Sequence, residues 1–301
     1  MRITRPSLAL SMVLLLPLAS RAEDCACSTA PQGAACSTKT SGEWTICESA
    51  NFRFCCRGKT TASRQTVEAA EALRAKLAEK WLGEDFLAGE PWRPKCDVIL
   101  HTSQASYLQA APGGQQTVGS SLVEAERGRI ITRRIDICAD RAGWFANALG
   151  HELTHVVLAD VFPNGNVPHW ADEGMAVMAD PAEKQNAHFR DLRIAQGSRS
   201  TLRVVELMSL AGYPRPEQQA AFYGQSASIV RYLVERDSPE RFVNFVRSAT
   251  RRGYEQALRE DYQIDGLREL ETRWARYVQR EATRSIVASK DLSSKPAIAV
   301  D

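Results

Sequence analysis

The segment GHELTHVVLAD, residues Gly150–Asp160, carries two histidines and a glutamate close together. It places His151 and His155 four residues apart, with Glu152 directly after the first histidine. In a helix, residues four apart lie on one face about one turn apart, so both imidazoles can bind one metal ion. Glu152 is rotated by about 100° around the helix and can reach a water molecule beside that ion instead. The pattern predicts a metal-dependent hydrolase with two histidine ligands and a carboxylate base.

The alternative is an ordinary buried helix that happens to carry two histidines. The neighbouring residues make the helix apolar almost all round, which predicts burial. They are Ala148, Leu149, Leu153, Val156, Val157 and Leu158. Burying two imidazoles in such surroundings costs free energy unless something binds them. A metal ion would do so, and we therefore favour the metal site.

A catalytic zinc site needs a third protein ligand and one open position. The segment PHWADEGMAVMAD, Pro168–Asp180, supplies candidates, which are His169, Asp172, Glu173 and Asp180. We expect Glu173 to be the third ligand. We expect His169 and Asp172 to have structural or supporting roles. Gly174, directly after Glu173, would permit another helix to approach closely.

These motifs resemble those of the gluzincin metallopeptidases, and most closely the peptidase MA-like group. The sequence His151-Glu152-Leu153-Thr154-His155 is followed by Trp170-Ala171-Asp172-Glu173-Gly174-Met175-Ala176, which is similar to the segment that carries the third ligand in that group. The resemblance covers the layout from about Val98 to Val278. It implies a zincin fold, in which a twisted sheet lies above the active-site helix and a helical C-terminal part closes the cleft. It also implies that Zn²⁺ is bound by His151, His155 and Glu173, with Glu152 as the general base.

A further site residue follows from the same resemblance. Gluzincins often use a tyrosine hydroxyl to hydrogen-bond the oxyanion, and FYGQSASIVRYLVERD (Phe222–Asp237) resembles their Tyr-x-x-Ser segment. The resemblance implies that Tyr223, just before a helix expected over Gln225–Arg236, is this catalytic donor. The alternative is that Tyr223 packs against the start of the helix. We expect Tyr232 to belong to the core.

The rest of the chain predicts an α+β fold, with a small mixed β-sheet first and a helical C-terminal part after it. Strands are expected on both sides of Ser49–Asn51, and at Cys96–His101, Thr117–Val123 and Arg129–Cys138. Helices are expected at 63–82, 104–109, 144–159, 170–179, 202–210, 225–236, 238–251 and 254–262, and from Asp265 on. We expect Thr117–Val123 to be an edge strand with which a substrate backbone can pair.

The first residues predict the compartment. Arg2 and Arg5 precede an apolar run, Leu8–Leu18, which ends at Ser20-Arg21-Ala22. This is the layout of a cleavable signal peptide over residues 1–22. The run is shorter than the roughly 20 residues that span a bilayer. The prediction is a secreted or periplasmic (extracytoplasmic) protein without a stable membrane anchor.

All eight cysteines follow the predicted cleavage site, at positions 25, 27, 36, 47, 55, 56, 96 and 138. An even number in an exported chain predicts disulfides. Cys96 and Cys138 could pair if they lie on neighbouring strands, and the Cys25-x-Cys27 and Cys55-Cys56 spacings are open to a metal-binding interpretation. The expected organisation is a signal peptide (1–22), a cysteine-rich segment (23–62), a zincin-like metallopeptidase domain (63–284) and a flexible tail (285–301).

The formal net charge is +2 and the arginines are scattered, which argues against nucleic acid as a partner. Three functions remain. The first is a secreted zinc metallopeptidase that cleaves peptide or protein substrates. The second is a catalytically inactive protein of the zincin fold, and the third is a disulfide-rich exported binding protein in which His151 and His155 are structural. The presence of Glu152 favours the first, because a binding scaffold has no need of a base.

Overall fold

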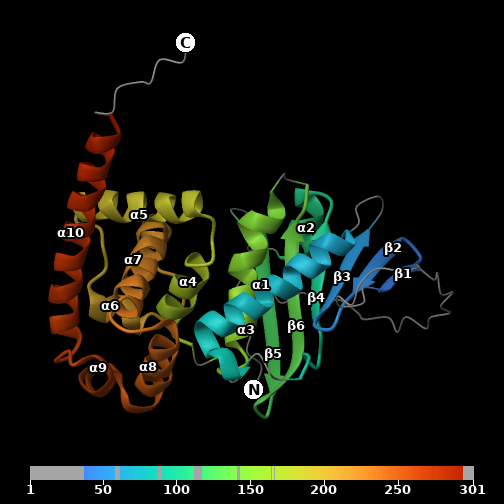
Figure 1. Cartoon of the computed structure of the whole chain (residues 1–301), viewed down its shortest axis with the longest axis horizontal. Helices are drawn as coiled ribbons and strands as arrows, with labels where there is room; N and C mark the ends of the chain where they lie inside the picture. Colours follow the sequence, from blue (N-terminus) through green and yellow to red (C-terminus); the bar gives the residue numbers. More distant parts are fainter. Residues whose placement is uncertain are drawn as a thin grey trace. The chain divides into compact units, whose positions relative to one another are not determined.

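The computed structural model describes residues 37–57, 62–86, 90–111, 117–140, 143–163, 165 and 167–293 (Figure 1). The chain divides into two compact units. The first, here called the sheet unit, comprises Met1–Val167 and Met175–Ala187, and the second, the helical unit, comprises Pro168–Gly174 and His188–Asp301. The expected signal peptide and Cys25, Cys27 and Cys36 lie outside the described residues.

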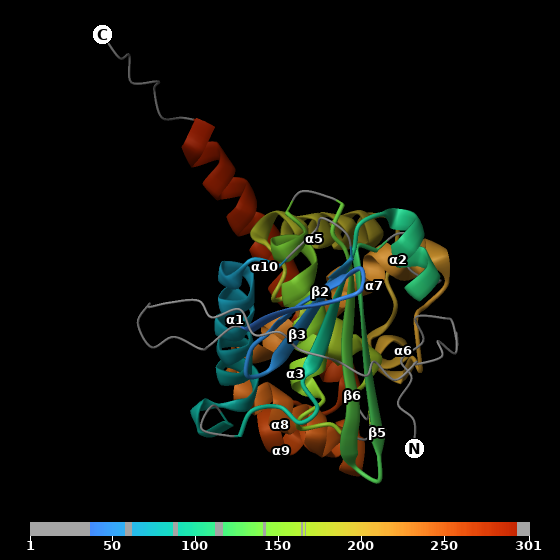
Figure 2. The same cartoon turned by 90° about the vertical axis from the view of Figure 1, so that its right-hand side faces the viewer.

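The sheet unit is built on a mixed six-stranded β-sheet (Figure 2). Its strands are β1 (Ser37–Ser41), β2 (Trp44–Glu48), β3 (Phe52–Arg57), β4 (Cys96–His101), β5 (Gly119–Glu126) and β6 (Arg129–Cys138), in the order β1-β2-β3-β4-β6-β5. β4 is parallel to both of its neighbours, and the other pairs are antiparallel. The expected strands are present, and the sheet is mixed as predicted. Only β1 was not predicted, because its polar sequence STKTS has no apolar alternation.

The edge position expected for Thr117–Val123 is confirmed, with the strand itself running from Gly119 to Glu126. A tight turn joins β5 to β6. Arg127 and Gly128 in this turn both have positive φ, at 50° and 78°. Such a turn matches the twist of the two strands that it connects. β5 therefore has β6 on one side and forms the end of the sheet on the other.

Side chains along each strand point alternately to the two faces of the sheet, and helices cover both faces. Cys96, Val98 and Leu100 of β4 are buried on one face, where α1 (Arg64–Leu82) contacts β3 and α3 (Gly150–Leu158) contacts β5 and β6. On the other face, α2 (Gln104–Ala110) packs Tyr107 against Cys138 of β6. The short helix η1 (Glu84–Phe86) follows α1. As predicted, Ser63 caps α1, because its Oγ accepts a hydrogen bond from the Thr66 N–H at 3.1 Å.

The helix expected over Trp144–Ala159 has two parts. One turn of π-helix, η2 (Phe145–Leu149), runs directly into α3. Leu153, Val156 and Val157 of α3 are fully buried, as its apolar pattern predicts. π-turns of this kind occur frequently at functional sites.

The helical unit agrees with the predicted helical C-terminal part. The helices after α3 are α4 (His169–Val177), α5 (Ala182–Gly197), α6 (Val204–Ser209), α7 (Pro216–Val234), α8 (Pro239–Arg252), α9 (Tyr254–Tyr262) and α10 (Leu267–Ser293), and the boundary between the units falls within α4 and α5. Three expectations differ from the structure. α5 was not predicted, α7 begins at Pro216 rather than at Gln225, and α10 continues beyond residue 285.

The expected close approach at Gly174 is confirmed. A Cβ atom on Gly174 would lie 2.5 Å from Cγ2 of Val230 and 2.8 Å from the backbone oxygen of Ser226, both on α7. Real Cβ atoms do not come so close, so α4 and α7 can pack at this distance only because residue 174 is glycine.

Gly174→Ala should therefore destabilise the protein. Forcing a methyl group into a packed helix contact costs typically 1–3 kcal/mol, and we expect a loss of roughly 3 kcal/mol in urea unfolding. Gly197→Ala is the matched control, because nothing lies within 4 Å of a Cβ at the end of α5. Equal stability of the two variants would contradict the close approach.

The predicted disulfides are not found among the described cysteines. No disulfide joins any two of them, and Cys55, Cys56 and Cys96 are thiols. Burial raises the pKa of the Cys55 thiol to about 12. The suggested Cys96–Cys138 pair is wrong because the register places Cys138 beside His101, at the other end of β4. At about 3.3 Å per residue, Cys96 lies roughly 16 Å away along the strand, far beyond the reach of a disulfide.

Among the described residues, no helix combines the length and the apolar character needed to cross a membrane.

Candidate metal centre

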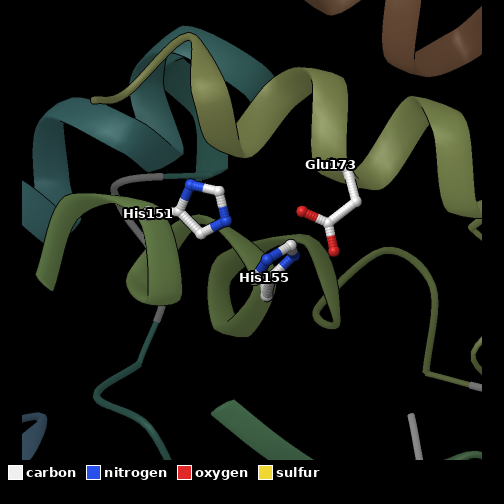
Figure 3. A group of neighbouring side chains, drawn as sticks. All are labelled: His151, His155 and Glu173. Atoms are coloured by element: carbon white, nitrogen blue, oxygen red, sulfur yellow. The ribbon is translucent and has the colours of Figure 1, made fainter. Parts of the chain in front are cut away.

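The structure brings His151, His155 and Glu173 together (Figure 3). The two imidazoles project from α3 and the carboxylate projects from α4, and the three side chains are turned toward one another. Each offers one ligand atom, and these atoms all lie within 4.8 Å of one another. The two imidazole ring centres are 5.1 Å apart, as the one-turn spacing along α3 requires.

The donor set fits zinc. Two imidazole nitrogens and one carboxylate oxygen are a known ligand set of catalytic zinc, which leaves a fourth position for water or substrate. Ligand atoms bound tetrahedrally at about 2.0–2.1 Å stand roughly 3.4 Å from one another. The separations of up to 4.8 Å exceed this value by at most about 1.4 Å, a difference that side-chain rotations can close.

Asp180, which follows α4, contacts the imidazole of His151. Its Oδ2 lies 3.3 Å from Nδ1 of His151, and its Oδ1 accepts a hydrogen bond from Lys184 Nζ at 2.8 Å. Burial would raise the pKa of Asp180, but the contacts with His151 and Lys184 outweigh it and hold that pKa below its ordinary value. A carboxylate at this place fixes the ring orientation and makes the other imidazole nitrogen a better ligand.

Glu152 packs against Gly119, the first residue of the edge strand β5. Its side chain is buried, with only 9% of the residue exposed. A Cβ on Gly119 of β5 would lie 2.9 Å from Cγ of Glu152, so the carboxylate side chain rests directly on the backbone of the edge strand. Within α3, Glu152 is rotated by about 100° from His151, and it is not one of the three residues whose ligand atoms converge.

His169 and Asp172 do not belong to the group of three. The ring of His169 lies 4.2 Å from that of Tyr213 and stacks on that of Phe222 at 5.3 Å. Asp172 is buried, with 2% exposed. Neither is close enough to the other ligand atoms to join them. Cys55 and Cys56 also belong to no such group within the described part of the chain.

Tyr223 lies inside α7 rather than before a helix, because Pro216 starts that helix early. Its ring is 5.4 Å from that of His188 and 6.1 Å from that of Tyr213. Tyr232 is in the core as predicted, with 5% exposed and its ring 5.2 Å from that of Tyr277.

Tyr213 was not predicted to be a site residue. Its hydroxyl donates a hydrogen bond to Oε1 of Glu173 at 2.7 Å, although 40% of the residue is exposed. Burial of the hydroxyl raises the Tyr213 pKa, and the Glu173 carboxylate and Tyr223 raise it further. Tyr213 follows α6 in a connecting loop. No local pattern in GYPRP distinguishes this tyrosine from a surface residue, so only its position in the fold reveals the contact.

A second polar group lies on the other face of the sheet. His101 bridges Ser106 Oγ, at 3.0 Å from Nδ1, and Asp136 Oδ1, at 2.7 Å from Nε2. The residue types match those of a serine hydrolase, but Arg134 also binds Asp136, and the Ser106 N–H donates to Ser103 rather than facing outward. This network ties α2 to the sheet.

Comparison with known protein families matches residues 124–280 to the model of the Peptidase MA superfamily. That stretch is more than half of the 301 residues. The chain belongs to the Peptidase MA superfamily.

The superfamily match begins within β5, ends within α10, and includes every member of the His151–His155–Glu173 group. Strands β1 to β4 and the cysteine-rich front segment lie outside it. Comparisons with curated proteins and with solved structures gave no match. The superfamily suggests a peptidase, and the geometry of the side chains is the remaining guide to its chemistry.

Proposed function

We propose that this chain is an exported zinc-dependent metallopeptidase of the gluzincin type. The observation that carries the proposal is the convergence of His151, His155 and Glu173 within 4.8 Å, inside the region that matches a peptidase superfamily. The roles follow the sequence prediction, with these three side chains as zinc ligands and Glu152 as the general base. When bound, zinc supplies Lewis acidity, which lowers the pKa of water and polarises a carbonyl group.

The protein's own residues would divide the remaining work. Glu152 would accept the proton of the attacking water and deliver it to the leaving amine, because a buried carboxylate beside the ligands can exchange protons without binding the ion. Asp180 would hold His151 in the ligating orientation through the 3.3 Å contact with its Nδ1. Tyr213 would hold Glu173 through the 2.7 Å hydrogen bond to its Oε1.

The substrate that this arrangement favours is an extended peptide segment. β5 is an edge strand, and an edge strand can pair with an added strand through backbone hydrogen bonds. Such pairing recognises the backbone of the substrate rather than its side chains, so unfolded protein segments are suitable substrates. A folded protein offers few segments that can pair in this way.

The direct test combines metal content with turnover. The purified protein should contain close to one zinc per chain after reconstitution and should cleave a mixture of unfolded proteins, with cleavage abolished by a chelator and restored by zinc. Bound zinc without cleavage would favour an inactive protein of the same fold. Absence of stoichiometric zinc would exclude both and leave a binding protein with structural histidines.

Replacing Tyr223 and replacing Tyr213, which binds Glu173, should have separable effects. Tyr223→Phe should lower kcat roughly a hundredfold with unchanged metal content, since an oxyanion donor acts mainly in the transition state. Tyr213→Phe should instead weaken zinc binding by roughly tenfold, because it removes a hydrogen bond that orients a ligand. Steady-state kinetics and a competing chelator measure the two effects. Tyr232→Phe, in the core, is the control. If Tyr223→Phe weakened zinc binding and Tyr213→Phe lowered kcat instead, the roles of the two tyrosines would be reversed.

A further inference from the structure

Gly119, the first residue of β5, lies against the proposed base. An ideal Cβ on this glycine would be 2.9 Å from Cγ of Glu152, 3.1 Å from its Oε1 and 3.2 Å from Cβ of Ala148. The first distance is shorter than real Cβ contacts allow, and Ala148 limits the space as well. The backbone of the edge strand and the side chain of Glu152 can therefore occupy these positions only when residue 119 has no side chain.

The backbone conformation does not require glycine here. Gly119 is not among the residues with positive φ, and it pairs with Ile137 in the regular register of β5 and β6. In a strand, glycine is normally unfavourable, because it loses more entropy on folding and adds no packing. What glycine supplies at this position is space for Glu152.

The backbone N–H of Gly119 is directed to the outer side of β5, which is the edge of the sheet. The Val118 carbonyl accepts a hydrogen bond from the Cys138 N–H at 2.9 Å, so it points toward β6. In a trans peptide the following N–H points the opposite way. The Gly119 N–H is therefore directed to the outer side of β5, where an added strand would pair.

We propose that Gly119 is a positioning residue that sets the location of the Glu152 carboxylate relative to the edge strand. This inference rests on the proposed function, in which Glu152 is the base and β5 receives the substrate. The backbone at 119 offers a donor to the added strand, and the missing side chain lets the base lie immediately beside that donor. The distance between substrate backbone and base is thereby determined by one residue.

A Gly119→Ala variant distinguishes the backbone N–H offered to the substrate from the space left for Glu152. Alanine keeps the N–H, so KM should stay within about twofold, while displacement of Glu152 should lower kcat by roughly thirtyfold, since a misplacement near 1 Å can cost about a hundredfold. Zinc affinity should be unchanged and the loss of thermal stability small, because the closest contact falls on the Glu152 side chain and not on a ligand. Gly197→Ala, with nothing within 4 Å of its Cβ, is the control.

A binding measurement tests whether the effect passes through Glu152. A small hydroxamate, acetohydroxamate, can chelate the metal and donate a hydrogen bond to a neighbouring carboxylate. Its affinity, measured by calorimetry on the zinc-loaded protein, should fall in Gly119→Ala and in Glu152→Gln, but no further in the double variant. Additive losses in the double variant would overturn the proposal, as would a folded Gly119→Ala protein with unaltered kcat.

The other possible outcomes also test the role of Gly119. If Gly119→Ala fails to fold, the double variant Gly119→Ala with Ala148→Gly removes the contact with the Ala148 Cβ, and it should fold with a reduced kcat. Full kcat in that variant would refute a positioning role. If the unaltered protein neither binds zinc nor cleaves peptides, the proposed function itself is wrong and this inference falls with it. An active protein whose kcat is insensitive to residue 119 refutes the inference alone.

Discussion

A Glu152→Gln variant should retain its zinc and lose between about a hundredfold and ten-thousandfold in kcat, the usual contribution of a positioned general base. Glutamine has nearly the shape of glutamate, so the packing against Gly119 would persist. It cannot accept a proton from water at neutral pH. The loss should therefore appear in kcat and kcat/KM alike, which is the signature of an interaction made only in the transition state.

The measurement requires kinetics and metal content on the same sample. Glu183→Gln is the matched control, because it makes the same chemical change at an exposed position on α5. It should leave both quantities unchanged. If Glu152→Gln kept full activity, Glu152 would not be the base, and the division of roles along α3 would have to be abandoned.

Removing a histidine should affect the metal instead. His155→Ala should weaken zinc binding by about a hundredfold or more, since total binding free energies of roughly 10–16 kcal/mol for four-ligand structural zinc sites correspond to about 3 kcal/mol per ligand. Turnover at limiting zinc should fall in proportion to the lost occupancy. Titration against a competing chelator of known affinity measures the change.

His188→Ala provides the comparison for this loss. His188 lies on α5 and contacts the ring of Tyr223 at 5.4 Å, but it does not belong to the group of three ligand candidates. Its replacement should leave zinc affinity unaltered. Unchanged zinc affinity in His155→Ala would show that the metal, if bound, is held elsewhere. Glu173→Gln extends the test to the third ligand without creating a cavity.

Local patterns in the sequence were sufficient for most helices and strands and for the proposed ligands. The four-residue spacing of His151 and His155 reflects the period of the helix itself, so it survives in any fold that keeps the helix. Glu173 could be selected from four candidates because Trp170–Ala176 resembles the segment that carries the third ligand in the peptidase MA-like group. α5 escaped prediction because its sequence is polar, with only Leu192 and Ala195 buried, and gives no apolar stripe. The predicted start of α7, at Gln225, was too late. The helix begins at Pro216, and proline is favoured at the first position of a helix.

The cysteines show the limit of such reasoning. An even number in an exported chain favours disulfides on average, but a bond requires two specific residues within a few ångströms. The parallel register of β4 and β6 decides that Cys138 faces His101 and not Cys96. Register depends on how two separate strands pack their buried faces together, so composition cannot predict it.

By itself, the sequence determined the helix that carries the two histidines, the rotation of Glu152 away from them, and the order of a sheet followed by helices. Each of these depends on hydrophobic periodicity or on spacing within one element. The tertiary structure alone decided that Tyr213 binds Glu173, that Asp180 supports His151, and that Gly119 leaves room for Glu152. Those contacts join residues 29 to 40 positions apart in the chain or on separate elements. They follow from side-chain packing between elements, which no local pattern specifies.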